Sequence, residues 1–364
     1  MKSALYHIFW KNLLIVVAVV VCVCYIKDST RPVITDPESE ELLDQWIAET
    51  EGMTPEECDI YVQEKNNLVM TDQRLGAKYV NAFRELSETH QNTEKLQEYI
   101  NFARNGEGVL TSAIPYKFIE NLDFYKDVTP ASMINDNPLS RYLNSQSGSV
   151  LLILSVLMFA VFMGQHYEAE IPRLSGVMKH GAAYHRSIRL ILIAISFVLF
   201  EANEIFDLYV SGMFDHSYIF SASLQSYKAY ITVSMDITIG QAILMIIAVK
   251  ALTLLFFCFG AELAAKYSKS VKNAVISSAV CFMAFTFIDM TISGFTYSSL
   301  WGIRATDPKA LISDSVRIPS LGVSTATLGL CFAFILTFAL LVWLLVSLRT
   351  AKHKRLSLFK RVTQ

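Results

Sequence analysis

Charged residues inside hydrophobic runs are the positions where this sequence could do chemistry within a membrane. Five residues of this kind occur in the second half of the chain: Glu201, Glu204, Asp236, Lys250 and Asp289. An isolated charge at the centre of a bilayer costs at least ~2.5 kcal/mol on insertion scales, so such groups usually pair with one another or line a pathway. Glu204, Asp236 and Asp289 lie near the predicted ends of their runs, where they can reach water. Glu201 and Lys250 lie deeper.

The depths of Glu201 and Lys250 predict an ion pair between them. If their runs meet the cytoplasm at about Ile188 and Phe259, Glu201 lies about 20 Å and Lys250 about 14 Å from that side, at 1.5 Å per residue. The difference of about 6 Å is within reach of an extended lysine side chain. The alternative is that Lys250 extends toward the cytoplasm and that Glu201 faces water in a central cavity.

Motifs of several common enzyme classes do not occur in this sequence. It contains no GxxxxGK[ST] phosphate-binding loop, no HExxH zinc motif and no GxSxG nucleophile motif. His180 and His185 are five residues apart, which does not place them on one helix face as a metal-binding pair. No basic patch is interleaved with aromatic residues in the manner of a nucleic-acid-binding face. We therefore expect this chain not to be an enzyme, and to have no catalytic, cofactor or metal site and no nucleic-acid partner.

A polar segment at 165–189 lies between two strongly apolar stretches and is rich in charged residues. Its candidate functional residues are Glu168, Glu170, Leu174, Met178, Gly181, Arg186 and Arg189. Leu174, Val177 and Met178 follow the spacing i, i+3, i+4, which places them on one side of a short helix. Two interpretations stay open: a solvated loop whose basic residues only set the topology, or a helix on the membrane surface that docks a cytoplasmic partner.

Six hydrophobic runs position these residues. They cover 8–26, 148–166, 188–210, 235–259, 273–297 and 322–348, in a chain of 364 residues of which 53% are hydrophobic. Each run is long enough to cross a bilayer as a helix. Lys and Arg gather near the N-terminus, in 165–189, in 261–272 and in the tail, and positive residues mark the cytoplasmic side. We predict an all-α polytopic membrane protein with six transmembrane helices and both termini in the cytoplasm.

The predicted domains follow from these runs. Residues 1–27 contain the first transmembrane helix, 28–147 form an extracytoplasmic helical domain, 148–348 contain transmembrane helices two to six, and 349–364 are a basic cytoplasmic tail. The extracytoplasmic block is acidic, with about 22 Asp and Glu against 11 Lys and Arg between Lys27 and Ser147. The net charge of the whole chain is only −2, so the acidity belongs to this block.

The extracytoplasmic block carries signals for several short amphipathic helices. Asp36-Pro37 and Thr54-Pro55 are typical helix starts, and Thr54 with Glu57 has capping-box spacing. Three hydrophobic stripes follow at helical spacing, and Asn105-Gly106 ends the last one. The stripes are Leu42, Leu43, Trp46 and Ile47; then Leu75, Tyr79, Phe83 and Leu86; then Leu96, Tyr99, Ile100 and Ala103. His90 is the block's single histidine, and we expect it to be exposed.

The layout of spans and the polar segment resembles the membrane subunit of an ABC exporter of the ABC-2 type. Such permeases have Glu residues after the second span, then a short coupling helix, then a Gly-Arg-like segment that leads into the third span. Glu168 and Glu170, the stretch 174–179, and Gly181 with Arg186 and Arg189 stand at the matching positions. The stretch 223–250 also resembles the run into the fourth span of such subunits. The chain departs from the pattern at Pro172-Arg173-Leu174 and at Ala182.

The resemblance implies a partnership and a location. The chain would pair with itself or with a sister permease, sit among the lipids of a bacterial cell membrane, and bind two cytoplasmic ABC ATPase subunits through 165–189. Those subunits would hydrolyse ATP and drive export, whereas this chain would need no cofactor. The alternative is a membrane sensor whose acidic outer domain binds a peptide. The sequence does not indicate the substrate.

Overall fold

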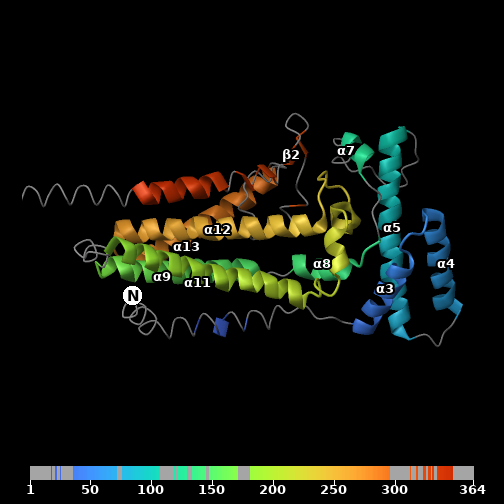
Figure 1. Cartoon of the computed structure of the whole chain (residues 1–364), viewed down its shortest axis with the longest axis horizontal. Helices are drawn as coiled ribbons and strands as arrows, with labels where there is room; N and C mark the ends of the chain where they lie inside the picture. Colours follow the sequence, from blue (N-terminus) through green and yellow to red (C-terminus); the bar gives the residue numbers. More distant parts are fainter. Residues whose placement is uncertain are drawn as a thin grey trace, which may run out of the picture.

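The computed structural model describes residues 36–71, 76–106, 122–128, 133–144, 147–170, 181–295 and 334–346, with a few isolated positions elsewhere. Helices make up nearly all of this part of the chain (Figure 1). Strands β1 (Arg317–Ile318) and β2 (Val323–Ser324) form a short antiparallel ladder in which Arg317 lies opposite Ser324. The predicted all-α class is confirmed.

A bundle of long helices forms the larger part of the molecule (Figure 1). Its members are α9 (Ser147–Glu168), α11 (Gly181–Val210), α12 (Ile239–Ser268) and α13 (Val271–Phe295). Consecutive helices run in opposite directions, and α9 packs against each of the other three. Large side chains such as Phe159, Phe162, Phe200 and Phe257 fill the core between them. Close packing of these side chains holds the helices together through many van der Waals contacts.

The helix ends differ from the predicted ends of the hydrophobic runs. Helix α12 continues to Ser268, so most of the predicted loop 261–272 is helical, and Lys269 ends the helix in a left-handed conformation with φ 50°. Helix α11 begins at Gly181, seven residues before the predicted start at 188. A capping box of Thr238 and Gln241 sets the start of α12. Charged residues near these ends are good helix formers, so the helices continue past the hydrophobic stretch.

One helix of the described chain, α12, is long and apolar enough to cross a membrane. Shorter apolar helical stretches occur at Leu152–Glu168, Val271–Ala284 and Phe334–Val346. The last of these packs against α12, where Leu344 is buried with Phe259 and Leu263. The first predicted span, apart from isolated positions, and the basic tail at 349–364 lie outside the described residues. The six-span topology stays a prediction.

The described residues between 36 and 144, here called the helical block, lie at one end of the bundle (Figure 1). The block contains α3 (Pro37–Glu49), α4 (Pro55–Thr71), α5 (Ala77–Asn105), α7 (Leu122–Asp127) and α8 (Asp136–Leu143). Both predicted helix starts are confirmed. The Asp36 side chain accepts a hydrogen bond from the Ser39 N–H, and the Thr54 N–H donates to Glu57 at 2.7 Å while the Glu57 N–H donates to the Thr54 hydroxyl at 3.3 Å.

Helix α5 corrects the expectation that every helix of the block is short. The second and third predicted stripes lie on this one helix of 29 residues, which ends at Gly106 in the left-handed conformation with φ 67°. The N-terminal half of α5 buries Ala82 and Leu86 against Leu43, Trp46 and Ile47 of α3. Its C-terminal half forms a second core, whose buried members are Leu96, Tyr99, Ile100, Ala103, Phe124, Tyr125, Val128 and Ile231. Leu75 lies outside the described residues.

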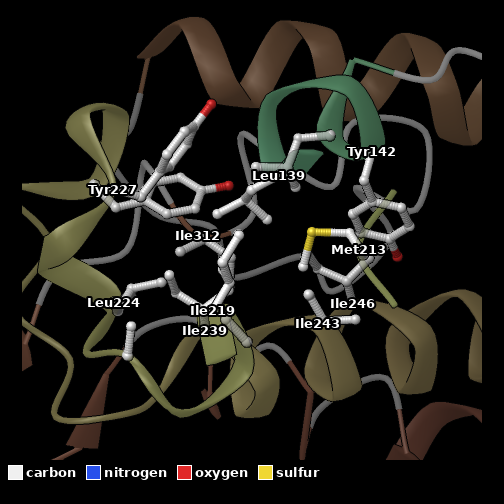
Figure 2. Packing of buried hydrophobic residues seen from close by; sticks show 14 of the residues in the cluster. Leu139, Tyr142, Met213, Ile219, Leu224, Tyr227, Ile239, Ile243, Ile246 and Ile312 are labelled. Carbon is white, nitrogen blue, oxygen red and sulfur yellow. The ribbon is translucent and has the colours of Figure 1, made fainter. Parts of the chain in front are cut away.

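The segment 211–238 connects α11 to α12 and packs against the helical block. It contains three 3₁₀ turns, η1 (Ser217–Ser221), η2 (Leu224–Ser226) and η3 (Lys228–Tyr230). The Gln225 amide donates to the carbonyls of Val233 at 2.8 Å and Met235 at 2.9 Å. Figure 2 shows the core that results, in which Leu139 and Tyr142 of α8 pack with Leu224 and Tyr227 of the segment and with Ile243 of α12.

A close approach between α9 and α13 depends on Gly164. A Cβ atom at this position would lie 2.8 Å from the Val271 Cα, a backbone atom, so the two helices would have to move apart. We expect Gly164→Ala to destabilise the protein by about 1–3 kcal/mol, as overpacking of a core does. Thermal unfolding of the purified full-length protein in detergent measures this loss.

Gly260→Ala is the matched control for Gly164→Ala. A Cβ atom at Gly260 in α12 has nothing within 4 Å, so alanine should be neutral or slightly stabilising there through its helix propensity. Equal melting temperatures for the two variants would mean that α9 and α13 do not approach closely at Gly164.

Candidate functional site

The predicted coupling residues that the structure describes, Glu168, Glu170, Gly181, Arg186 and Arg189, lie around the end of the bundle opposite the helical block. Leu174 and Met178 are outside the described residues, so the predicted surface helix is not described. Glu168 is the last residue of α9, and its carboxylate accepts a hydrogen bond of 3.1 Å from the Val271 N–H at the start of α13. Negative charge is favourable at a helix N-terminus, so Glu168 stabilises the α13 end there. Glu170 follows in a left-handed conformation with φ 50°.

The C-terminal part of the predicted site lies on α11. Gly181 is the first residue of this helix. Arg186 is exposed and Arg189 is buried, although they are only three residues apart. The sequence pattern treated both as one basic group, whereas the structure gives them different surroundings.

Arg189 forms a bidentate ion pair with Glu262 of α12. Its Nε donates to one carboxylate oxygen and its Nη2 to the other, both at 2.6 Å. Arg189 is 5% exposed and Glu262 is 0% exposed. Planar guanidinium and carboxylate groups match in this arrangement, which makes it among the strongest of protein hydrogen-bonded pairs. Sequence reasoning missed Glu262 because it assigned Ala261–Lys272 to a loop.

Three further side chains complete what we call the basal cluster, which consists of His166, Tyr167, His185, Arg189 and Glu262. The Tyr167 hydroxyl donates to Glu262 at 3.2 Å. The His166 Nε2 lies 2.6 Å from the His185 Nδ1, and the two rings stack with their centroids 4.8 Å apart. The observed histidine pair is thus His166 and His185, from α9 and α11, which no sequence spacing indicated.

The hydrogen bonds of the basal cluster fix the tautomers of its histidines. Arg189 Nη2, which can only donate, lies 3.3 Å from His185 Nε2, so this nitrogen accepts and the ring proton is on Nδ1. His185 Nδ1 then donates to His166 Nε2, which leaves the proton of His166 on its own Nδ1. Within the described chain that Nδ1 is buried and has no hydrogen-bond partner.

The basal cluster joins the ends of three helices on either side of 171–180. Tyr167 belongs to α9, Arg189 to α11 and Glu262 to α12. Displacement of α11 from α12 would leave a buried charge unpaired, whereas displacement of α9 would remove the Tyr167 hydrogen bond to Glu262. Breaking a buried pair in this way costs about 3–5 kcal/mol.

The predicted ion pair between Glu201 and Lys250 is wrong. Lys250 Nζ donates instead to Glu204 at 2.6 Å, and the two side chains are 6% and 1% exposed. Glu201 and Glu204 are three residues apart on α11, so their side chains leave the helix in directions that differ by about 60°. Residue counting estimates depth along the axis and not which face of α11 is turned toward α12. Glu204, which was expected to reach water near a helix end, is therefore the buried partner.

The remaining predicted intramembrane charges have different positions. Asp236 is exposed in the segment before α12, so it is not a charge within the bundle, which is a correction to the prediction. Asp289 belongs to α13, but its side chain lies outside the described part.

Tyr142 of α8 donates to Glu204 at 3.5 Å and so connects the helical block to the ion pair. One oxygen of Glu201 is buried and has no hydrogen-bond partner among the described residues.

A second set of polar contacts, the interface cluster, joins the helical block to the segment 211–238; it consists of Glu40, Asp44, Arg141 and His216. Arg141 makes a bidentate pair with Glu40 at 2.6 and 3.0 Å and also donates to the Ser211 carbonyl at 3.0 Å. His216 Nε2 contacts the Asp44 carboxylate. The sequence did not indicate this cluster, because the two partners in each of these contacts are 70 or more positions apart.

No protein-family model, curated protein or solved structure gives a significant match to this chain.

The Glu204–Lys250 pair can be tested by two double-mutant cycles. Lys250→Met and Glu204→Gln should each reduce the yield of folded protein in membranes, and the double variant should lose less than the sum because neither buried charge is then unpaired. In the second cycle, Lys250→Met with Glu201→Gln should give a clearly smaller coupling. A larger coupling to Glu201 than to Glu204 would contradict the observed pairing.

The contacts of the helical block with 211–238 should weaken as pH rises from about 4 through 7. Burial raises the pKa of the Asp136 carboxyl to about 7 from 3.8, so the folded state binds this proton more tightly. Its contribution to stability is complete below 3.8 and is lost as pH rises from there to about 7. The hydrogen bond to Asp44 raises the pKa of His216 above its ordinary 6.5. That contribution is complete below 6.5 and is lost as pH rises through the raised value.

Thermal unfolding across this pH window measures the effect. The double variant Asp136→Asn and His216→Gln removes both titrations and should show a flatter dependence on pH than the unmodified protein. Identical pH profiles for the two proteins would exclude Asp136 and His216 as the titrating groups.

Proposed function

We propose that the chain is the membrane-spanning permease subunit of an ATP-driven exporter of the ABC-2 type. In this proposal the six hydrophobic runs cross a bacterial cell membrane, both termini are cytoplasmic, and the helical block is outside. Separate ABC ATPase subunits bind the segment 165–189, and a second permease, identical or related, completes the transporter. The substrate stays open.

The observation that carries this proposal is the basal cluster. The segment 171–180 follows α9, which carries Tyr167 near its end, and precedes α11, which carries His185 and Arg189. Glu262 of α12 binds both Tyr167 and Arg189. A force applied to 171–180 would therefore reach three helices through short, buried polar contacts. ATP-driven closure of a docked ATPase needs a connection of this kind to move a helix bundle.

Two further features support a membrane role. Helix α12 is long enough, at about 45 Å for 30 residues, to cross a bilayer. The charges within the bundle are mostly satisfied internally, as with Lys250 and Glu204, and charged groups in transmembrane bundles face the interior and pair in this way. The positive residues of the connections favour the proposed orientation.

The interface cluster favours a second candidate function, that of a membrane sensor. Glu40 and Asp44 of α3 contact Arg141 and His216, so a ligand bound to the acidic helical block could act on α11 and α12 through the segment 211–238. In that case the cytoplasmic segment would report to a signalling partner and not receive force from an ATPase. Affinity purification from the native membrane distinguishes the two: a nucleotide-binding subunit supports the exporter, and a kinase supports the sensor.

Substitutions in the coupling segment test the exporter proposal directly. We expect the double variant Leu174→Asp and Met178→Asp to insert normally but to lose most stimulation of the ATPase, because charges would replace the apolar face that docks. The measurement is ATP hydrolysis by the purified complex in lipid vesicles.

The matched control places the same charges elsewhere. Ile60 and Val80 are exposed hydrophobic residues of α4 and α5, with 59% and 51% exposure. The double variant Ile60→Asp and Val80→Asp should keep ATPase stimulation. Normal stimulation in the Leu174 and Met178 variant would remove the case for a docking helix at 165–189.

A further inference from the structure

Three potential metal ligands meet where α4 lies against α5. Asp59 belongs to α4, and His90 and Glu94 belong to α5. His90 Nε2 lies 2.9 Å from an Asp59 oxygen and 3.7 Å from a Glu94 oxygen. All three ligand atoms lie within 4.8 Å of one another. The expectation that His90 is exposed is wrong, since its side chain is only 12% exposed between these carboxylates.

The spacing of these atoms fits a metal ion without a large movement of the backbone. Ligand atoms about 2.0–2.2 Å from a tetrahedral ion are separated by about 3.4 Å, and the two measured separations lie on either side of this value. His90 and Glu94 are four residues apart, so they project from the same face of α5. Asp59 reaches them from the neighbouring helix, which gives a site with three ligands from two rigid elements.

The charge around these atoms also favours a cation. In the described chain no Lys or Arg forms an ion pair with Asp59 or Glu94, and the His90 ring lies beside both carboxylates. Two carboxylates and a neutral imidazole supply two negative charges, which match a divalent ion. Asp59 and Glu94 are 55% and 53% exposed, so solvent can deliver the ion and occupy its remaining coordination position.

The donor set narrows the class of metal. Ca²⁺ and Mg²⁺ prefer ligand sets made only of oxygen, whereas an imidazole nitrogen with carboxylates suits Zn²⁺ and the neighbouring divalent transition metals. The competing occupant is a proton, which would make His90 a charged partner of Asp59 and Glu94 with no metal bound.

We propose that Asp59, His90 and Glu94 bind a divalent first-row transition-metal ion, with Zn²⁺ the best match, and that this ion fastens α4 to α5. The ion would stabilise the position of α4, because none of the residues of this helix is fully buried. Its hydrogen bonds to α3, from Tyr61 and Lys65 to Glu49, are exposed to solvent. The proposal is independent of the exporter and sensor functions, since it concerns only the helical block.

Zn²⁺ titration of the full-length protein tests the proposal. The protein is purified in detergent with a tag that contains no histidine, stripped with a chelator, and titrated calorimetrically with ZnCl₂ at pH 7.5. We expect one saturable site per chain. His90→Ala and Asp59→Ala should each weaken binding at least tenfold. Cobalt(II) in place of zinc should give visible absorption bands of a coordinated ion, and His90→Ala should abolish them.

Glu64→Ala is the matched control. Glu64 is an exposed acid on α4, so this variant changes the charge of the same helix by the same amount as Asp59→Ala but removes no ligand. It should bind Zn²⁺ as the unmodified protein does. Absence of saturable binding, or equal binding by the His90→Ala and Glu64→Ala variants, would overturn the proposal and leave His90 as an ion-pair partner only.

Discussion

The pairing of Arg189 with Glu262 is the interaction on which the arrangement of the helix bundle depends. Both groups are almost completely removed from solvent, and a buried charge is tolerated only when an opposite charge and further hydrogen bonds satisfy it. This requirement fixes the position of α11 along α12. Tyr167, which donates to the same carboxylate, brings the end of α9 into the arrangement.

Glu204 and Lys250 form a second buried ion pair between α11 and α12, closer to the helical block. These two charges must also stay paired when the helices pack. Apolar helices that pack through Leu, Ile, Val and Phe can slide past one another by a turn with little change in buried area, so apolar packing alone specifies the register weakly. Two ion pairs join α11 and α12, and they are separated by about half of the length of α11. Together they allow one register only. Tyr142 extends the second pair to α8, so the position of the helical block follows from the same alignment.

Features set by local sequence were predictable, whereas those set by the facing side of a helix were not. The caps at Asp36 and Thr54 and the stop at Gly106 depend on neighbouring residues, and all three were confirmed. The division of α5 into two helices was wrong. Residues 87–95 are polar and carry no hydrophobic stripe, so periodicity did not show that the helix continues through them. Glu204 was missed as the partner of Lys250 because a sequence gives depth along a helix but not the direction in which the helix is turned. Of the candidate site, Glu168 and Arg189 were identified, while Glu262, His166 and Tyr167 required the folded chain.

The second core of the helical block has a consequence for synthesis of the protein. Ile231 is a buried member of this core, and the Tyr125 hydroxyl donates to the Ile231 carbonyl at 3.0 Å. The ribosome makes Ile231 almost 90 residues after the end of α8, which takes roughly 4–18 s at ordinary rates of elongation. During this interval α5 and α7 are complete but lack part of their core. The block is therefore not a self-contained folding unit. The apolar face of α5 and α7 stays exposed until α11 has been synthesised and Ile231 packs against it.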